Sequence, residues 1–103
     1  MLLPEHKFLI EKAGPKENTK DQKHSFKTFV FRKPGFTNEF GEKVGKDDLF
    51  EAKAWNKTID ELPAVSMGDK VAVMLVLNGK EYLDQNQGIN YSLQLTIQKM
   101  KVL

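Results

Sequence analysis

The sequence predicts an all-β domain with one short helix, folded as a small closed or nearly closed antiparallel barrel. Five segments show the alternating or continuous apolar patterns of strands, and only one segment has a persuasive helix start. Helical crossovers are missing between most of these strands, which disfavours a parallel βαβ sheet. The chain has 103 residues, the length of one ordinary domain, so we expect a single domain over residues 1–103.

The first two strands are separated by a polar stretch. Lys7–Glu11 is a short strand with Phe8 and Ile10 on one face. The polar segment Gly14–Lys23, which contains Gly, Pro and Asn, is expected to be a loop. Ser25–Lys33 has the aromatic and β-branched content of a strand.

A long hairpin loop over residues about 34–48, with three Gly and a Pro, leads to the other three strands. Leu49–Trp55 alternates between small or aromatic and polar residues. Val71–Leu77 is a continuous apolar run, suited to a strand buried on both faces. Asn90–Lys99 alternates again. Its predicted inward row is Tyr91, Leu93, Leu95 and Ile97.

The helix is expected after the third strand. Thr58 and Glu61 have the spacing of a capping box, in which each side chain satisfies a free backbone N–H, and Pro63 keeps the helix short. Met67–Lys70 then forms a turn into the buried strand. Three strands, a helix and two strands is the order of the five-stranded OB-fold, with the helix between strands 3 and 4.

Composition excludes several classes of function. There is no cysteine, so disulfides, thiolate metal sites and cysteine nucleophiles are impossible, and a reducing, cytoplasmic location fits best. The longest apolar run, Val71–Leu77, is far shorter than the roughly 20 residues of a membrane span, so no membrane partner is expected. The net charge is only +2, but residues 1–33 hold eight Lys or Arg against four acids. This basic third can attract phosphate, or it is a solvated lysine-rich surface.

Trp55 is the principal candidate for binding. Alternation along the third strand places Phe50, Ala52 and Ala54 on the core face and therefore puts Trp55 in the outward row with Lys53. An exposed indole beside a cation is a stacking platform for nucleic-acid bases. The alternative is that Trp55 turns inward at the strand end and packs under the helix.

Other aromatic residues lie on the predicted hairpins. Phe36 and Phe40 stand in the long loop among Lys33, Lys43 and Lys46, an arrangement in which cations follow phosphates while rings meet bases. Alternatively, one or both Phe anchor the loop to the barrel.

Tyr82, near the tip of the last hairpin, is either a second platform or a hairpin aromatic that packs across the strand pair.

Three short motifs resemble a known family. Trp55-Asn56-Lys57 closes the third strand, and Met67-Gly68-Asp69-Lys70-Val71 opens the fourth. The last hairpin, Tyr82–Tyr91, has an aromatic two residues before an Asp, a Gly near its tip and a Tyr at the final strand. In these motifs the chain resembles the bacterial and phage single-stranded-DNA-binding protein family. The resemblance spans roughly Phe8–Val102, with matching motifs in the second half only.

The resemblance implies non-enzymatic binding of single-stranded DNA across an OB barrel, often by oligomers. Trp55 and Tyr82 match the family's stacking aromatics, and Lys57 matches the lysine of its motif. Asn56 replaces the usual Gly, the first strand lacks the family's Gly-Asn exit, and the chain ends at Leu103 without an acidic tail. We therefore expect a minimal, phage-type member that does not recruit partners through such a tail.

Enzyme functions are not expected. His6 and His24 are the only histidines and have no spaced carboxylate partner, so we expect no metal site. Gly41–Lys46 is one residue short of a phosphate-binding P-loop and is followed by Asp47 rather than Ser or Thr. The sequence predicts no catalytic residue and no cofactor.

The predicted function is binding of single-stranded DNA without sequence preference, protecting it in replication or recombination. The expected partners are this DNA, further copies of the chain in a dimer or tetramer, and replication or recombination proteins. The expected location is the cytoplasm, or the host cytoplasm for a phage protein. The alternative functions are an OB-fold protein–protein adaptor in a primosome or phage assembly, and binding of single-stranded RNA. The predicted DNA-binding residues are Trp55, Tyr82, Lys53, Lys57, Arg32, Lys33, Phe36, Phe40, Lys43 and Lys46.

Overall fold

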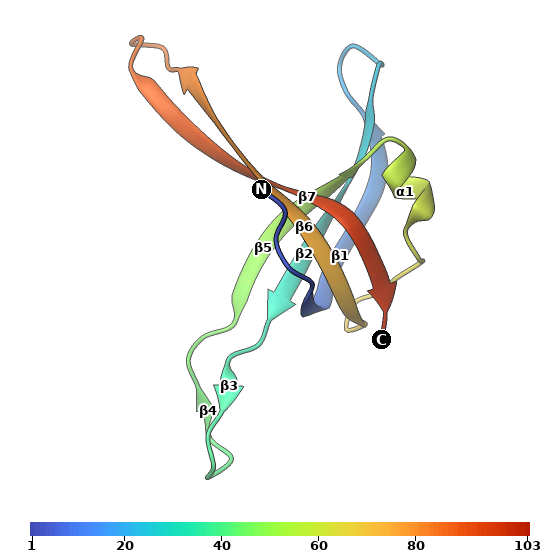
Figure 1. Cartoon of the computed structure of the whole chain (residues 1–103), viewed down its shortest axis with the longest axis vertical. Coiled ribbons are helices and arrows are strands. Elements are labelled where there is room, and N and C mark those ends of the chain that lie inside the picture. The colour runs from blue at the N-terminus through green and yellow to red at the C-terminus, as the bar shows by residue number, and fades with distance from the viewer.

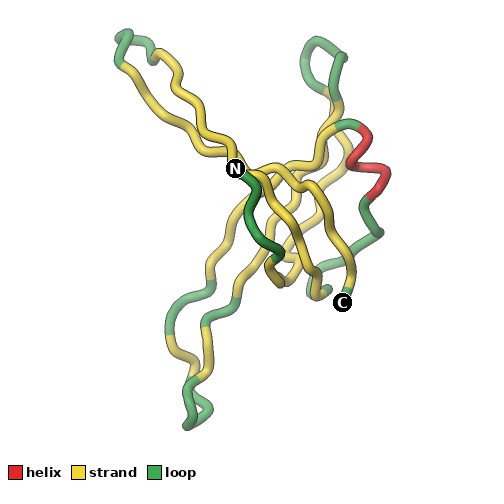
Figure 2. The backbone as a smooth tube through the Cα atoms, in the orientation of Figure 1, coloured by secondary structure: helices red, strands yellow, loops and turns green.

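A computed structural model describes the whole chain, residues 1–103. It confirms the predicted class, because the chain is mostly strand with one short helix (Figure 2). The elements in chain order are β1 (His6–Asn18), β2 (Ser25–Lys33), β3 (Phe36–Thr37), β4 (Lys43–Val44), β5 (Asp48–Trp55), α1 (Lys57–Glu61), β6 (Lys70–Leu83) and β7 (Ile89–Val102). The single helix, α1, has five residues, too few for a membrane-spanning helix.

The five long strands form a closed barrel in the order β1-β2-β5-β7-β6 (Figure 1). Neighbours in this order are antiparallel except β5 and β7, which pair in parallel through Lys53 and Thr96. The helix α1 lies between the third and fourth barrel strands in chain order, as predicted for the OB-fold. The short strands β3 and β4 pair only with each other and form a hairpin in the predicted long loop.

The core lies inside the barrel. Its largest fully buried side chains are Phe29 and Phe31 of β2, Ile10 of β1, Ile97 of β7, and Val71 and Val73 of β6. Ala52 and Ala54 are buried on the inward face of β5, as the alternation predicts. Small side chains on β5 leave room for the two phenylalanines of β2, so large and small residues interlock across the barrel.

The structure corrects the predicted loop at Gly14–Lys23, because β1 continues through Asn18 and only the turn beyond it is irregular. The β1–β2 register shifts twice, between Ile10 and Lys12 and again between Ala13 and Lys16. A Cβ atom at Gly14 would lie 3.0 Å from the carbonyl oxygen of Thr28. The glycine that suggested a loop therefore permits a close strand approach at an irregularity of the ladder.

The helix start also differs from the prediction. Asn56, not Thr58, stands at the cap position, and its side chain does not cap the helix. Its backbone has φ 51° and ψ −123°, a left-handed conformation that favours glycine, and its Oδ1 accepts a hydrogen bond from the Ser25 N–H at 3.1 Å. Leu62, which precedes Pro63, is extended and ends the helix as expected.

The last two strands are longer than predicted and leave the barrel as a hairpin (Figure 1). We call residues 78–94 of this hairpin the arm. The prediction that Tyr91 and Leu93 face the core is wrong, because they are 77% and 69% exposed. Both lie on the same alternating row as buried Ile97, but they belong to the part of β7 that extends beyond the barrel.

Candidate nucleic-acid interface

The outer face of β2 and β5 brings the predicted tryptophan together with a second aromatic ring. Phe26 of β2 pairs with Trp55 of β5, and Thr28 pairs with Lys53. The ring centroids of Phe26 and Trp55 are 5.3 Å apart with 44° between the planes, within the range of favourable aromatic pairs. Trp55 is thus held in the predicted outward row by a partner ring on the next strand.

Lys53 lies over both rings. Its Nζ atom is 4.8 Å from the Phe26 centroid and 5.9 Å from the Trp55 centroid, so it makes cation–π contacts with both. The arrangement places one positive charge directly beside two aromatic faces. Aromatic rings beside cations are the combination that single-strand-binding surfaces use for bases and phosphates.

Beside this cluster the surface is hollowed. A shallow depression of about 210 Å³ lies between β5 and β7 and is lined by Glu51, Lys53, Trp55, Gln94 and Thr96, among others. This is the seam at which β5 and β7 share the single parallel pair Lys53–Thr96. The seam therefore offers a concave place next to the tryptophan.

Tyr82 belongs to the same side of the sheet. Residues directly opposite in a ladder share a face, and Tyr82 pairs with Asn90, six residues along β7 from Thr96. At roughly 3.3 Å per residue this is about 20 Å from Lys53. Tyr82 is 50% exposed, and Lys80 and Gln94 lie on the same face between it and the seam. A continuous polar face thus joins the tryptophan cluster to Tyr82.

Phe36 and Phe40 are fully available in the long loop. They are 69% and 78% exposed, so neither anchors the loop to the barrel. Figure 1 shows this loop projecting from the end of the barrel opposite α1. Trp55 is the last residue of β5, whereas Phe36 lies in the β3–β4 hairpin beyond the first residue of β5, and β5 itself is roughly 23 Å long. The predicted aromatics therefore do not form one cluster.

Two of the predicted phosphate-binding cations are already paired. Arg32 donates to Glu11 at 2.8 Å and to Asp47, and Lys43 lies 2.7 Å from Asp47. The N–H of Gly35 donates to Asp47 as well, at 3.0 Å. These contacts tie the base of the long loop to β1 and β2. The charges of Arg32 and Lys43 are therefore already used in ion pairs that stabilise the loop.

The pairing lowers the pKa values of both carboxyl groups. Hydrogen bonds from Lys43, from the Gly35 N–H and from Arg32 hold the pKa of Asp47 well below its ordinary range. The hydrogen bond from Arg32 likewise lowers the pKa of Glu11, and these two carboxylates raise the pKa of Arg32. The loop base is thus stabilised by charges that persist at neutral pH.

This network predicts a pH-dependent difference between the wild type and Asp47→Asn. Because the folded pKa of Asp47 is depressed, its contribution is complete above the unfolded value of about 3.9 and disappears as the pH falls through the folded value. We expect the variant to have a lower urea midpoint at pH 7, and the gap to shrink below about pH 4. Urea titrations monitored by Trp55 fluorescence measure both curves. A gap that stays constant down to pH 2 contradicts the proposed ion pairing.

The remaining predicted lysines are scattered. Lys57 opens α1 next to the tryptophan cluster and is exposed. Lys33 ends β2, with its Nζ atom 5.7 Å from the Phe8 centroid, and Lys46 is exposed in the long loop. The structure therefore brings Lys53 and Lys57 to the tryptophan end of the face, and Lys33 and Lys46 to the loop end.

Phe26 was missed by the sequence argument. It has the opposite parity to Phe29 and Phe31 along β2, and alternation alone puts it outside the barrel when they are inside. Its place in the outward row of a strand, where aromatic residues are available for stacking, is the signal that could have identified it.

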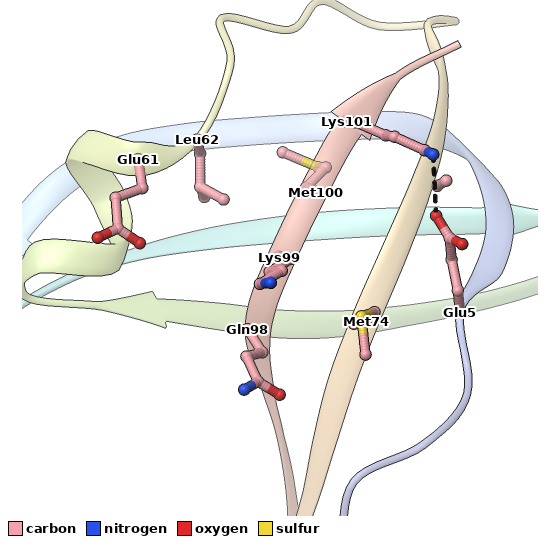
Figure 3. Close-up of a pocket in the computed structure, with 9 residues that line it drawn as sticks. Glu5, Glu61, Leu62, Met74, Gln98, Lys99, Met100 and Lys101 are labelled. Atoms are coloured by element: carbon pink, nitrogen blue, oxygen red, sulfur yellow. Dashed lines mark ion pairs between the residues drawn. The ribbon is translucent and has the colours of Figure 1, made fainter.

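A second hollow lies away from this face, beside α1, β6 and β7 (Figure 3). It has a volume of about 400 Å³, with apolar lining from Leu62, Met74 and Met100. Glu5 and Lys101 pair across its rim at 3.7 Å. Its mixed charges and the absence of an aromatic ring make it unlike a nucleic-acid groove.

The chain has no group of three or more His, Cys, Asp or Glu side chains that could hold a metal ion. Neither a protein-family model nor a curated protein sequence matches the chain.

Proposed function

We propose that this protein binds single-stranded DNA without sequence preference and protects it in replication or recombination. The observation that carries the proposal is the cluster of Phe26, Trp55 and Lys53 on the outer face of the barrel. In OB-folds this region, together with the neighbouring loops, is where oligonucleotides bind. A stacking ring needs no particular base, which accounts for binding without sequence preference.

The DNA runs along the outer face from the long loop to the tryptophan cluster. The bases stack on Trp55 and on Phe36 or Phe40, and Lys33, Lys46, Lys53 and Lys57 neutralise the phosphates. Tyr82, on the arm, stacks on a further base, because its side of the hairpin continues the outer face that carries Lys53. We place this activity in the cytoplasm, in keeping with a chain that has no cysteine.

The experiment is a fluorescence titration of the lone tryptophan, Trp55, with oligo-dT. We expect strong quenching, because a base stacked on the indole quenches its emission, and we expect the affinity to fall as salt rises from about 50 to 200 mM. Duplex DNA of the same length is the control, since its bases are not available to the rings. The same titration with oligo-U compares the affinity for single-stranded RNA with that for single-stranded DNA. If oligo-dT neither quenches the emission nor binds at low salt, the DNA proposal is wrong.

The second candidate is a protein–protein adaptor, favoured by the exposed Phe36 and Phe40 on a projecting loop whose surroundings are rich in acids. Glu39, Glu42 and Asp48 lie within or next to this loop and oppose a polyanion. An adaptor uses exposed aromatics as anchors for another protein surface. If no oligonucleotide binds in the titration above, the adaptor is the better-supported function.

A further inference from the structure

A third hollow lies over the start of β1, between the end of β2 and the start of β6. It has a volume of about 380 Å³ and is lined by Lys7, Phe8, Leu9, Lys33, Pro34 and Lys70. Leu9 pairs with Arg32 of β2 on one side and with Lys70 of β6 on the other, so both neighbouring strands flank β1 here. Three of the lining residues are lysines, and none is an acid.

The three lysines of this hollow are free to bind an anion, because none of them makes an ion pair within the chain. Asp48 stands opposite Lys33 in the β2–β5 ladder but does not line the hollow. Asp69 precedes Lys70, and its carboxylate accepts a hydrogen bond from the Ser66 N–H at 2.8 Å. Three like charges around one hollow repel one another, and a bound anion removes this repulsion.

Lys33 is held in place at the hollow by two contacts. Its Nζ atom donates to the Lys7 carbonyl oxygen at 3.4 Å and lies 5.7 Å from the centroid of the Phe8 ring. That ring is partly buried, and its centroid lies 5.7 Å from that of Phe31 and 5.0 Å from that of Phe50. The ammonium group is therefore positioned before a ligand arrives, which reduces the entropy lost on binding.

The charge of the hollow fits a terminal phosphate better than an internal one. An internal phosphate of DNA carries one negative charge, whereas a phosphate monoester carries about 1.5 to 2 near pH 7. The depression beside Trp55 is lined by one lysine, Lys53, together with Glu51, whereas this hollow has three lysines and no acid. Lysine binds phosphate as a compact point charge, while arginine is the residue that matches the planar geometry of a carboxylate.

We propose that this hollow binds the terminal phosphate of a single DNA strand. The inference rests on the proposed function, because Lys33 and Pro34 lie where the proposed DNA path reaches the long loop. The three lysines bind the phosphate oxygens, and the apolar walls contact the terminal sugar. Such ends arise when a phosphodiester is hydrolysed, which leaves the phosphate on one side of the break. The protein therefore prefers strand ends that carry a phosphate to those that carry a hydroxyl.

The hollow and the tryptophan cluster are far apart on the barrel. Trp55 pairs with Phe26, and Lys33 follows Phe26 by seven residues along β2, a distance of roughly 23 Å. A strand whose terminal phosphate lies in the hollow reaches the indole only with a base further along. A mononucleotide in the hollow does not touch the indole at all.

Binding of oligo-dT with different ends tests the proposal. Three oligonucleotides of one length carry a 5′-phosphate, a 3′-phosphate or hydroxyl groups at both ends, and an internal dye reports anisotropy. We expect at least one phosphorylated form to bind roughly tenfold more tightly than the hydroxyl form at about 50 mM salt, which identifies the end in the hollow. If all three bind equally, this inference is wrong and the proposed function stands. If none binds, both are wrong.

Variants of the lining lysines locate the gain. Lys7→Gln and Lys70→Gln each remove one charge at an exposed position, and each is expected to reduce the tenfold ratio to about threefold or less. Lys16→Gln, the same substitution at an exposed lysine of β1 that does not line the hollow, is the matched control and should keep the ratio. A ratio that survives in the Lys7→Gln, Lys70→Gln double variant, with the thermal midpoint of the wild type, overturns the proposal.

Thymidine monophosphates test the hollow without the rest of the DNA path. The probes are the 5′- and 3′-monophosphates, with thymidine as the control, and the amide NMR shifts of the full chain are the readout. We expect a monophosphate to shift the amides of Lys7, Lys33 and Lys70 and to leave those around Trp55 unchanged. Shifts spread evenly over all exposed lysines contradict a site. If a polyglutamate peptide shifts these amides and neither monophosphate does, the hollow binds acidic proteins and the proposal is wrong.

Discussion

Replacing Phe31 by alanine is expected to lower the free energy of unfolding by about 3–5 kcal/mol. Phe31 is fully buried in the hydrophobic core. Its ring lies 5.7 Å from that of Phe8, 5.5 Å from that of Phe50 and 6.1 Å from that of Phe29. The substitution removes the apolar area of one ring and leaves a cavity that three rigid neighbours cannot fill by rotation.

The loss is large relative to the whole, because domains of this size are stabilised by about 5–15 kcal/mol. Urea unfolding measures it: we expect a lower midpoint with an unchanged m-value, since the same surface is exposed on unfolding. Phe36→Ala is the matched control, a phenylalanine that is 69% exposed, and is expected to change stability by no more than about 0.5 kcal/mol. If Phe31→Ala costs less than about 1 kcal/mol, the barrel is not packed around this ring.

The alternation of side chains correctly predicted the strands whose inward residues form the barrel core. β2 was predicted with its bounds, and the inward row of β5 was identified from Ala52 and Ala54. These predictions succeeded because a half-buried strand must place its core residues at every second position. The order of strands around the helix then limited the topology to the OB-fold.

The lengths of the hairpins could not be predicted in the same way. The arm carries the same alternating apolar row as the barrel, so Tyr91 and Leu93 look like core residues in the sequence. Where a barrel ends depends on which strands flank the pair, and those neighbours are distant in the chain. Gly14 was misleading for a related reason: the Thr28 carbonyl oxygen that lies close to it belongs to the neighbouring strand, and the spacing of residues does not reveal this approach.

The position of Trp55 on the barrel was predicted from the sequence, but the ion pairs around the long loop were not. Parity put Trp55 outside the barrel beside Lys53, and the structure adds Phe26 as the ring that supports it. Arg32 and Lys43 were predicted to neutralise phosphates. Their pairing with Asp47 depends on how the long loop folds back onto β2, which residue spacing does not reveal.

Replacing Trp55 by alanine is expected to weaken oligo-dT binding by roughly 5- to 150-fold, since one stacked base contributes about 1–3 kcal/mol. The loss should be similar for all base compositions, because stacking does not distinguish them. The variant has no tryptophan, so the readout is the anisotropy of a dye-labelled oligonucleotide. Met67→Ala, a change at a 77% exposed residue in the turn before β6, is the control and should bind as the wild type does.

Salt dependence distinguishes the ring from the cation above it. Trp55→Ala removes no charge, so the slope of log affinity against log salt should stay as in the wild type. Lys53→Gln removes one phosphate contact and should reduce that slope by about 0.7. Because Phe26 touches Trp55 at 5.3 Å between centroids, Phe26→Ala should add little to Trp55→Ala: the two rings form one platform and their losses overlap. If Trp55→Ala binds as tightly as the wild type, this platform is not where the DNA lies.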